Sequence, residues 1–357
     1  MSQMMKSLTS ICFHCWFLTF VWAAVLGLSV GGCTRRVQPP VVRPEIFWPP
    51  PPEVKRVEFV KAVSTPADVN IRPGIWKRLV RYIAGRGAAS LVSPYGIATD
   101  ARGRLYVVDT FLKRIHVFDA TGNQYYSFPE DDPVLASPIA IAIDKEDRIY
   151  VTDSKKGVVC IFKDGGKEFL TAFGDGIFKR PTGIAVNPES AELLVVDTLQ
   201  SRVYRFDTSD RRLKGSFGTD GAAEGMFHYP TNISATGTGD IIVSDALNFR
   251  VQVFSSQGQF LFAIGRMGNM PGSFSRPKGV ASDSDGHIYV VDALFDNIQV
   301  FDRMGRVLMA FGDHGTAYGS FWLPTGLYID KNDLIYVSDS SNRRVQIFRY
   351  LKEDKAK

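Results

Sequence analysis

Residues 324–348 read PTGLYIDKNDLIYVSDSSNRRVQIF, and five earlier stretches of the chain repeat this pattern. Each copy begins with a proline, a short apolar run and a polar turn. A β-branched run that ends in aspartate follows, and then a loop and a run that alternates apolar and polar residues. The copies begin at Pro94, Pro138, Pro181, Pro230, Pro277 and Pro324. Their aspartates recur about every 44 to 48 residues, which is the period of propeller blades rather than of helical repeats.

One copy predicts four antiparallel strands. In the fifth copy, Gly286 supplies the positive φ of a hairpin turn between a small apolar run and a β-branched run. An alternating run and a final apolar run follow, so the expected strands cover 278–282, 287–291, 298–301 and 307–311. Six such copies predict an all-β fold, a six-bladed β-propeller with four-stranded antiparallel blades.

The sixth copy lacks its fourth strand, because the pattern stops near residue 351. A blade left open would expose an unpaired strand edge. Residues 55–63, which precede the first copy, alternate apolar and polar side chains as a strand does. We therefore expect this N-terminal strand to close the last blade.

The repeat resembles the NHL repeat. The resemblance is clearest at Asn342, Arg344, Gln346 and Phe348, and in the Phe-Gly pairs that precede several blades. It covers residues 56–351 and implies the propeller fold. Proteins with NHL-like propellers include RNA-binding and protein-binding domains, sensor domains of bacterial kinases and a zinc-dependent lyase, so the resemblance leaves function open.

The N-terminus is similar to a bacterial lipoprotein signal. Residues 11–30 are almost entirely apolar, and two glycines then precede Cys33. We expect cleavage before Cys33 and lipidation of this cysteine. An uncleaved membrane helix or an ordinary signal peptide would also fit the apolar run. Thr34 stands where lipoproteins retained at the inner membrane usually have aspartate, which favours the outer membrane of the cell envelope.

These features predict five segments. They are a signal peptide (1–32), a Pro-rich linker (33–53), a closing strand with an amphipathic helix near 75–83 (54–92), six blades (93–351) and a charged tail (352–357). Phe47 and Trp48 are atypical of a solvated linker and fit either packing on the propeller or the lipid interface. Cys160 is expected to be a buried structural thiol.

The repeated aspartates are expected to be structural. Asp109, Asp153, Asp197, Asp245, Asp292 and Asp339 occupy the same register in every blade, where a carboxylate can accept backbone N–H bonds. Only His228 and His314 fall in loops that could line the axial mouth, which is a weak signal for a metal. We expect no catalytic residue, no metal and no cofactor, and a net charge of +5 does not suggest nucleic acid binding.

Two sets of loops are expected to open on one face, namely the loops entering the blades and the loops after the repeated aspartates. Their tips are rich in apolar and aromatic residues beside cations, which is typical of a protein interface. The candidate partner-binding residues are Phe111, Leu112, Lys113, Arg180, Tyr229, Phe249, Arg266, Arg276, Lys278, Phe295 and Trp322. These side chains could instead fold down onto neighbouring blades.

The sequence favours a non-catalytic, monomeric propeller that is anchored to a membrane by lipid and binds another protein of the cell envelope. Two alternatives remain open. One is a lactonase-like or lyase-like enzyme with an axial metal, and the other is a binder of a glycan or another small ligand, for which aromatic loop residues would provide stacking surfaces.

Overall fold

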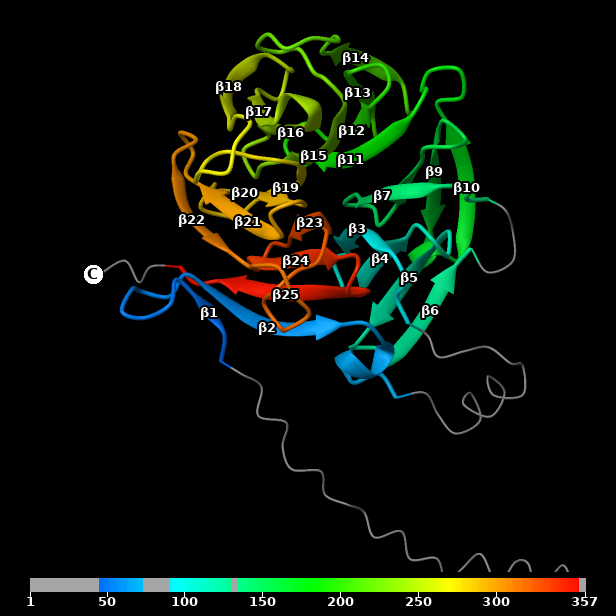
Figure 1. Cartoon of the computed structure of the whole chain (residues 1–357). Helices are drawn as coiled ribbons and strands as arrows, with labels where there is room; N and C mark the ends of the chain where they lie inside the picture. The colour runs from blue at the N-terminus through cyan, green and yellow to red at the C-terminus, as the bar shows by residue number, and fades with distance from the viewer. Residues whose placement is uncertain (1–44, 73–89, 130–133, 353–357) are drawn as a thin grey trace, which may run out of the picture. The chain divides into compact units, whose positions relative to one another are not determined.

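Six β-sheets surround a central axis in the computed structural model, which describes residues 45–72, 90–129 and 134–352 (Figure 1). Residues from Glu45 onward belong to one unit. Every sheet is antiparallel, and the sheets follow one another around the axis in chain order. The predicted six-bladed propeller is therefore confirmed.

The first five blades contain four strands each. Blades 1 to 3 contain β3 (Pro94–Thr99), β4 (Leu105–Asp109), β5 (Arg114–Asp119), β6 (Gln124–Phe128), β7 (Pro138–Ile143), β8 (Ile149–Asp153), β9 (Val158–Lys163), β10 (Glu168–Phe173), β11 (Pro181–Asn187), β12 (Glu192–Asp197), β13 (Arg202–Asp207) and β14 (Leu213–Phe217). Blades 4 and 5 contain β15 (Pro230–Ala235), β16 (Ile241–Asp245), β17 (Arg250–Phe254), β18 (Phe260–Ile264), β19 (Pro277–Ser282), β20 (Ile288–Asp292), β21 (Asn297–Phe301) and β22 (Val307–Phe311).

Blade 6 combines both ends of the described chain. It contains β23 (Pro324–Ile329), β24 (Leu334–Asp339), β25 (Arg344–Tyr350), β2 (Val57–Val63) and β1 (Phe47–Trp48). Strand β2 pairs with β25, with Val57 opposite Tyr350 and Val63 opposite Val345. The predicted closure of the last blade by an N-terminal strand is thus confirmed.

Strand β1 extends blade 6 by one more strand than expected. Phe47 and Trp48, which fall within the predicted Pro-rich linker, pair with Glu58 and Val57 of β2. The Trp48 ring lies 5.5 Å from Phe311 and 5.8 Å from Phe348, measured between ring centroids. Of the two environments considered for Trp48, the structure shows packing on the propeller.

The described helices are short 3₁₀ turns, namely η1 (Pro66–Val69), η2 (Asp164–Gly166) and η3 (Ala246–Asn248). The amphipathic helix expected near 75–83 lies outside the described residues, as do Cys33 and the signal sequence. Within the described parts of the chain, no helix has the length and apolar character needed to cross a membrane.

A fixed register explains the repeated proline and glycine. In each blade the repeated proline lies opposite the repeated aspartate of the next strand, as Pro94 does opposite Asp109. The glycine two residues after the proline lies against the next blade. A Cβ on Gly96 would come within 2.8 Å of the Ala140 Cα, so a larger residue would push two blades apart.

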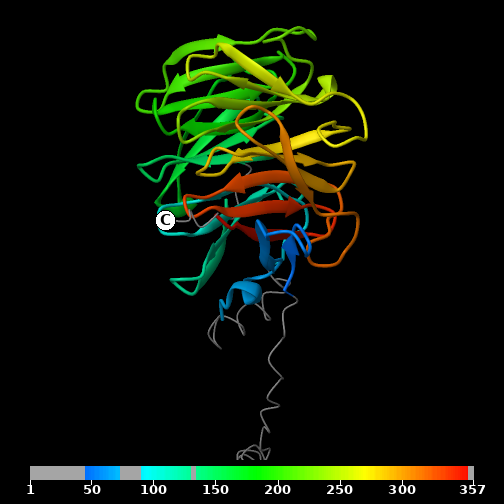
Figure 2. The ribbon, with the colours of Figure 1, turned by 90° about the vertical axis from the view of Figure 1, so that its left-hand side faces the viewer.

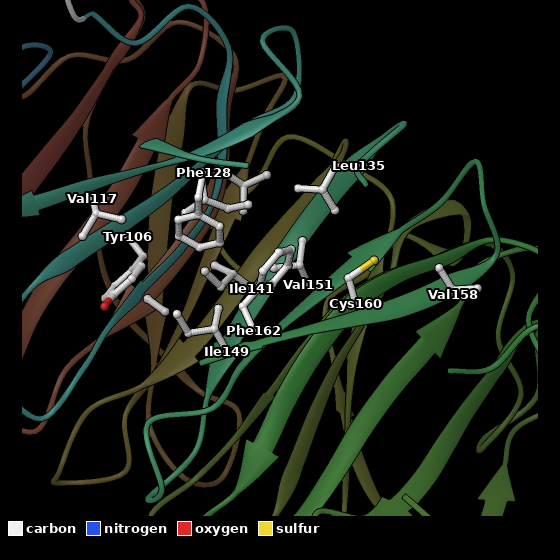
Figure 3. Close-up of a cluster of buried hydrophobic side chains, with 13 residues drawn as sticks. Tyr106, Val117, Phe128, Leu135, Ile141, Ile149, Val151, Val158, Cys160 and Phe162 are labelled. Carbon is white, nitrogen blue, oxygen red and sulfur yellow. The ribbon is translucent and has the colours of Figure 1, made fainter. Parts of the chain in front are cut away.

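The hydrophobic core is divided among the interfaces between blades. Figure 3 shows the cluster between blades 1 and 2, where Phe128 and Phe162 pack with their ring centroids 5.0 Å apart. Cys160 is a free, buried thiol in this cluster. Burial, with a smaller effect from Asp153, raises the pKa of the Cys160 thiol to about 11, as expected of a structural rather than a reactive cysteine.

The ring has two faces, and Figure 2 shows its strands running between them. The loops entering the blades and the loops after the repeated aspartates are hydrogen-bonded to one another. For example, Thr198 N–H donates to the Arg180 carbonyl, and Ala293 N–H donates to the Arg276 carbonyl, both at 3.0 Å. These loops therefore share one face, which we call the loop face.

Candidate binding face

The six repeated aspartates hold the loop face together from inside. All six side chains are fully buried. Asp292, for example, accepts N–H groups of Ser275 and Arg276 from the entering loop and of Leu294 and Phe295 from the following loop, at 2.6 to 3.3 Å. Each carboxylate thus fixes two loops, which leaves it no free oxygen aimed at a ligand.

The arginine five residues after the aspartate varies in its partner. Arg250 and Arg344 donate from Nε to Asp245 and Asp339 at 2.8 and 2.7 Å. Arg114 and Arg202 instead contact the Ser127 hydroxyl and the Gly218 carbonyl. An arginine–aspartate pair therefore forms in blades 4 and 6 but not in blades 1 and 3.

Apolar side chains protrude from the loop face. Three leucines share one register after the repeated aspartates, namely Leu199, Leu247 and Leu294. They are 54%, 48% and 52% exposed, so they do not form a buried ring between blades. Phe111 and Met267 are 71% and 73% exposed. Exposed apolar tips arranged around one face are typical of an interaction surface.

The loops that enter blades 4, 5 and 6 are anchored beneath these tips. Phe227, Phe274 and Phe321 are fully buried and each forms a parallel bridge to the start of its own loop. Buried anchors hold each loop in one conformation. A partner would thus meet a largely preformed surface, which reduces the entropy lost on binding.

Most of the predicted partner-binding residues reach solvent on the loop face. The exposed ones are Phe111, Lys113, Arg180, Arg266, Arg276, Phe295 and Trp322. The half-buried ones are Leu112, Tyr229, Phe249 and Lys278. We distinguish two zones on this face. The outer zone comprises the exposed apolar tips Phe111, Leu199, Leu247, Met267, Leu294, Phe295 and Trp322, and the cationic zone comprises Arg180, Arg276 and Lys278, which lie beside the first residues of the innermost strands. The sequence did not separate the two zones.

The cationic zone lies where the innermost strands begin. Arg180 Nη1 donates to the Tyr229 hydroxyl at 2.7 Å, and the guanidinium carbon lies 5.8 Å from the centroid of the Tyr229 ring. Burial and the charges of Arg276 and Arg180 lower the pKa of Lys278 to about 8. Burial raises the pKa of Tyr95 to about 12, although the charges of the same two arginines act to lower it. These groups from blades 1, 3, 4 and 5 therefore lie close together.

Below this zone the axis is hollow. The innermost strands line a cavity of about 230 Å³, with Tyr95 among its lining residues. Asn232 replaces the glycine of other blades at this lining, and its side-chain oxygen has no hydrogen-bond partner. An unpaired amide oxygen thus joins the polar side chains of Thr99, Ser234 and Ser282 in the channel lining.

The histidines do not gather at the axis. His228 and His314 contact Asp220 and Asp296, at 3.3 and 2.7 Å. His116 is buried in the third strand of blade 1, with Nδ1 2.7 Å from the Tyr125 hydroxyl. Across the described ranges, no group of three or more histidines, cysteines and carboxylates could hold a metal ion.

A second repeated constellation was missed in the sequence. On the opposite face, a tyrosine hydroxyl donates to an aspartate six residues earlier in four blades. The pairs are Tyr106–Asp100, Tyr150–Asp144, Tyr289–Asp283 and Tyr336–Asp330, at 2.8 to 3.2 Å. The constant spacing would have revealed it. Because it closes hairpins, its role is structural.

Two family models match parts of this chain. An NHL repeat matches residues 321–348, and a family described as a 6-bladed beta-propeller matches residues 222–293. Together with the six observed blades, these matches show that the chain is an NHL-repeat six-bladed β-propeller.

Similarity to individual proteins is partial. Protein brain tumor of Drosophila melanogaster is 32% identical over 93 residues, which is 26% of this chain and 9% of that protein. The chain thus spans less than a tenth of that relative's length.

Solved structures share the fold at low identity. An auxiliary nutrient binding protein from Bacteroides thetaiotaomicron has a TM-score of 0.59 at 15% identity, covering 73% of this chain and 70% of its own. Virginiamycin B lyase from Staphylococcus aureus has a TM-score of 0.53 at 14% identity, covering 73% and 96%. These similarities extend to the fold alone.

Proposed function

We propose that this chain is a non-catalytic, protein-binding propeller, tethered in a bacterial cell envelope by a lipid on Cys33. The observation that supports binding is the outer zone of exposed apolar tips on anchored loops of one face. Burying such tips removes apolar surface from water and requires little loop ordering. The anchor rests on the sequence before Cys33 and is tested by fatty-acid labelling that Cys33→Ser should abolish.

The binding proposal is tested with two matched triple variants of the full chain. One changes Phe111, Met267 and Leu294 on the loop face to serine. The other changes Leu170, Leu213 and Leu261, which lie on outermost strands and are 40% to 48% exposed, to serine. Affinity capture from gently solubilised envelope, quantified by mass spectrometry, compares both with the wild type.

We expect one protein to be captured stoichiometrically by the wild type and by the outer-strand variant but not by the loop-face variant. Loss of a few central apolar contacts typically costs several kcal/mol of binding, about a 100-fold weakening or more. Capture that survives the loop-face changes, or that is lost equally with the outer-strand changes, would contradict the proposal.

A further inference from the structure

The innermost strand of each blade begins on the loop face, and its second residue follows the repeated proline. These residues are Tyr95, Ile139, Thr182, Thr231, Lys278 and Thr325, of which Tyr95 lines the central cavity. The loop-face end of each innermost strand thus contributes one side chain near the axis, where neighbouring innermost strands pack against one another. Lys278 is the only cation in this ring.

Hydroxyl groups link the ring in some blades and are missing in others. Thr198 and Ser340, which follow the repeated aspartates, donate to the carbonyls of Pro230 and Pro94 in the next blade, both at 2.7 Å. They also contact the hydroxyls of Thr182 and Thr325. In blades 4 and 5 the equivalent residues are Ala246 and Ala293.

The missing hydroxyls leave blade 4 with an unpaired polar group at the mouth. Only 8% of the surface of Thr231 is exposed, and its hydroxyl has no hydrogen-bond partner. An unpaired buried hydroxyl is unfavourable and in native proteins usually marks an absent water, ion or ligand. Lys278 occupies the same position in the adjacent blade.

Three cations meet in this sector without a counter-ion. Arg180 and Arg276 precede the prolines of blades 3 and 5, and both act on Lys278 strongly enough to contribute to its lowered pKa. None of the three forms an ion pair with any carboxylate of the described chain, whereas Arg104, Arg148, Arg205, Arg250 and Arg344 all do. The mouth therefore carries uncompensated positive charge.

The carboxylates nearest in the fold are committed elsewhere. The strands packed against β19 contribute the titratable groups Asp245, Tyr289, Asp292 and Tyr328. Asp292 accepts the backbone N–H of Arg276 rather than its guanidinium, and Asp245 pairs with Arg250. Neither neutralises Lys278, so an anion bound there would not compete with a carboxylate of these strands.

We propose that the loop-face mouth of the channel is a binding site for a multiply charged oxyanion, held by Lys278, Arg276 and Arg180. Guanidinium groups bind carboxylate or phosphate oxygens in pairs, and the half-buried ammonium adds a charge where water screens it poorly. Arg180 is already positioned by Tyr229. The site requires no protein partner and is separate from the outer zone of apolar tips.

Isothermal titration calorimetry of the full chain tests the site with citrate and with inorganic phosphate, using acetate at equal ionic strength as the singly charged control. The variants are Lys278→Gln and Arg276→Gln. The matched control is Arg102→Gln, which removes an exposed positive charge from a hairpin of the opposite face. Thermal unfolding of each variant confirms that it is folded.

We expect saturable binding of citrate or phosphate, weakened at least about tenfold by each mouth variant and unaffected by Arg102→Gln. The tighter of the two anions identifies the ligand group as carboxylate or phosphate. Absence of saturable binding, equal binding of acetate, or equal loss with Arg102→Gln would overturn the site. None of these results depends on whether a protein partner is captured.

Citrate binding should also depend on pH. Lys278, with a pKa lowered to about 8, loses its charge as pH rises above that value, while Arg180 and Arg276 stay charged and Tyr95 titrates near 12. Binding should therefore weaken above pH 8 in the wild type but not in Lys278→Arg. A wild-type affinity that stays constant through this range would exclude Lys278 from the site.

Discussion

Asp109 shows how a repeated residue keeps its role when its neighbour changes. Blades 4, 5 and 6 place Gln252, Gln299 and Gln346 in the middle of the third strand, where blade 1 has His116. Gln252 and Gln346 donate to the repeated aspartate at 3.1 and 3.0 Å. His116 Nε2 lies 3.6 Å from Asp109 Oδ2, so the histidine occupies the same place in blade 1.

This arrangement predicts acid sensitivity. Burial raises the pKa of Asp109, but His116 and the N–H groups of Leu112, Val92 and Ser93 outweigh burial and lower it to about 2. Because the folded pKa lies below the unfolded value, the stabilisation is complete above about pH 4 and is lost as pH falls toward 2. Its full size is about 2 kcal/mol.

Urea unfolding between pH 5 and pH 2.5 measures this contribution. The free energy of unfolding of the wild type should fall more steeply with acid than that of Asp109→Asn, which has no carboxylate to protonate. Parallel pH profiles for the two proteins would show that Asp109 is not held in its charged form by the fold.

At the scale of a strand, two residues add a fifth member to blade 6. The Trp48 ring packs on Phe311 and Phe348, while the Phe47 ring faces the Lys55 ammonium 5.1 Å from its centroid. Trp48→Ala should therefore destabilise the fold by about 2 kcal/mol, because a half-buried aromatic contact is lost. Phe47→Ala, a change of similar size in the same strand, should cost about 1 kcal/mol or less.

Chemical denaturation of both variants distinguishes packing from strand pairing. If β1 acts only through its backbone, the two substitutions would have equal effects, and that result would contradict a packing role for Trp48.

The elements differed in how well the sequence predicted them. Six blades followed from the repeated prolines and aspartates, and the closing strand followed from a count of strands in the last copy. Strand β1 was not predicted, because a pair of residues between prolines has no periodicity to detect. Arg180, Arg276 and Lys278 were predicted on the loop face, but their grouping was not, because Arg180 and Arg276 are far apart in sequence and come together only when the ring closes.

For the whole molecule, the pairing of β2 with β25 is the only described strand pairing that joins the two ends of the ring. Without it, β25 would expose a strand edge and the buried side chains of Val345 and Phe348. A chain covering residues 64–357 should therefore lose its cooperative thermal transition and self-associate. A chain covering residues 45–357 should remain folded and monomeric.

Circular dichroism melting and size-exclusion chromatography report these two properties. A synthetic peptide of residues 45–63 provides the decisive addition, because it restores the missing edge without restoring the covalent link. If ring closure acts through strand pairing, the peptide should return the shorter chain to a monomer with a cooperative transition. A shorter chain that melts like the longer one without the peptide would mean that the interfaces between blades hold the ring closed by themselves.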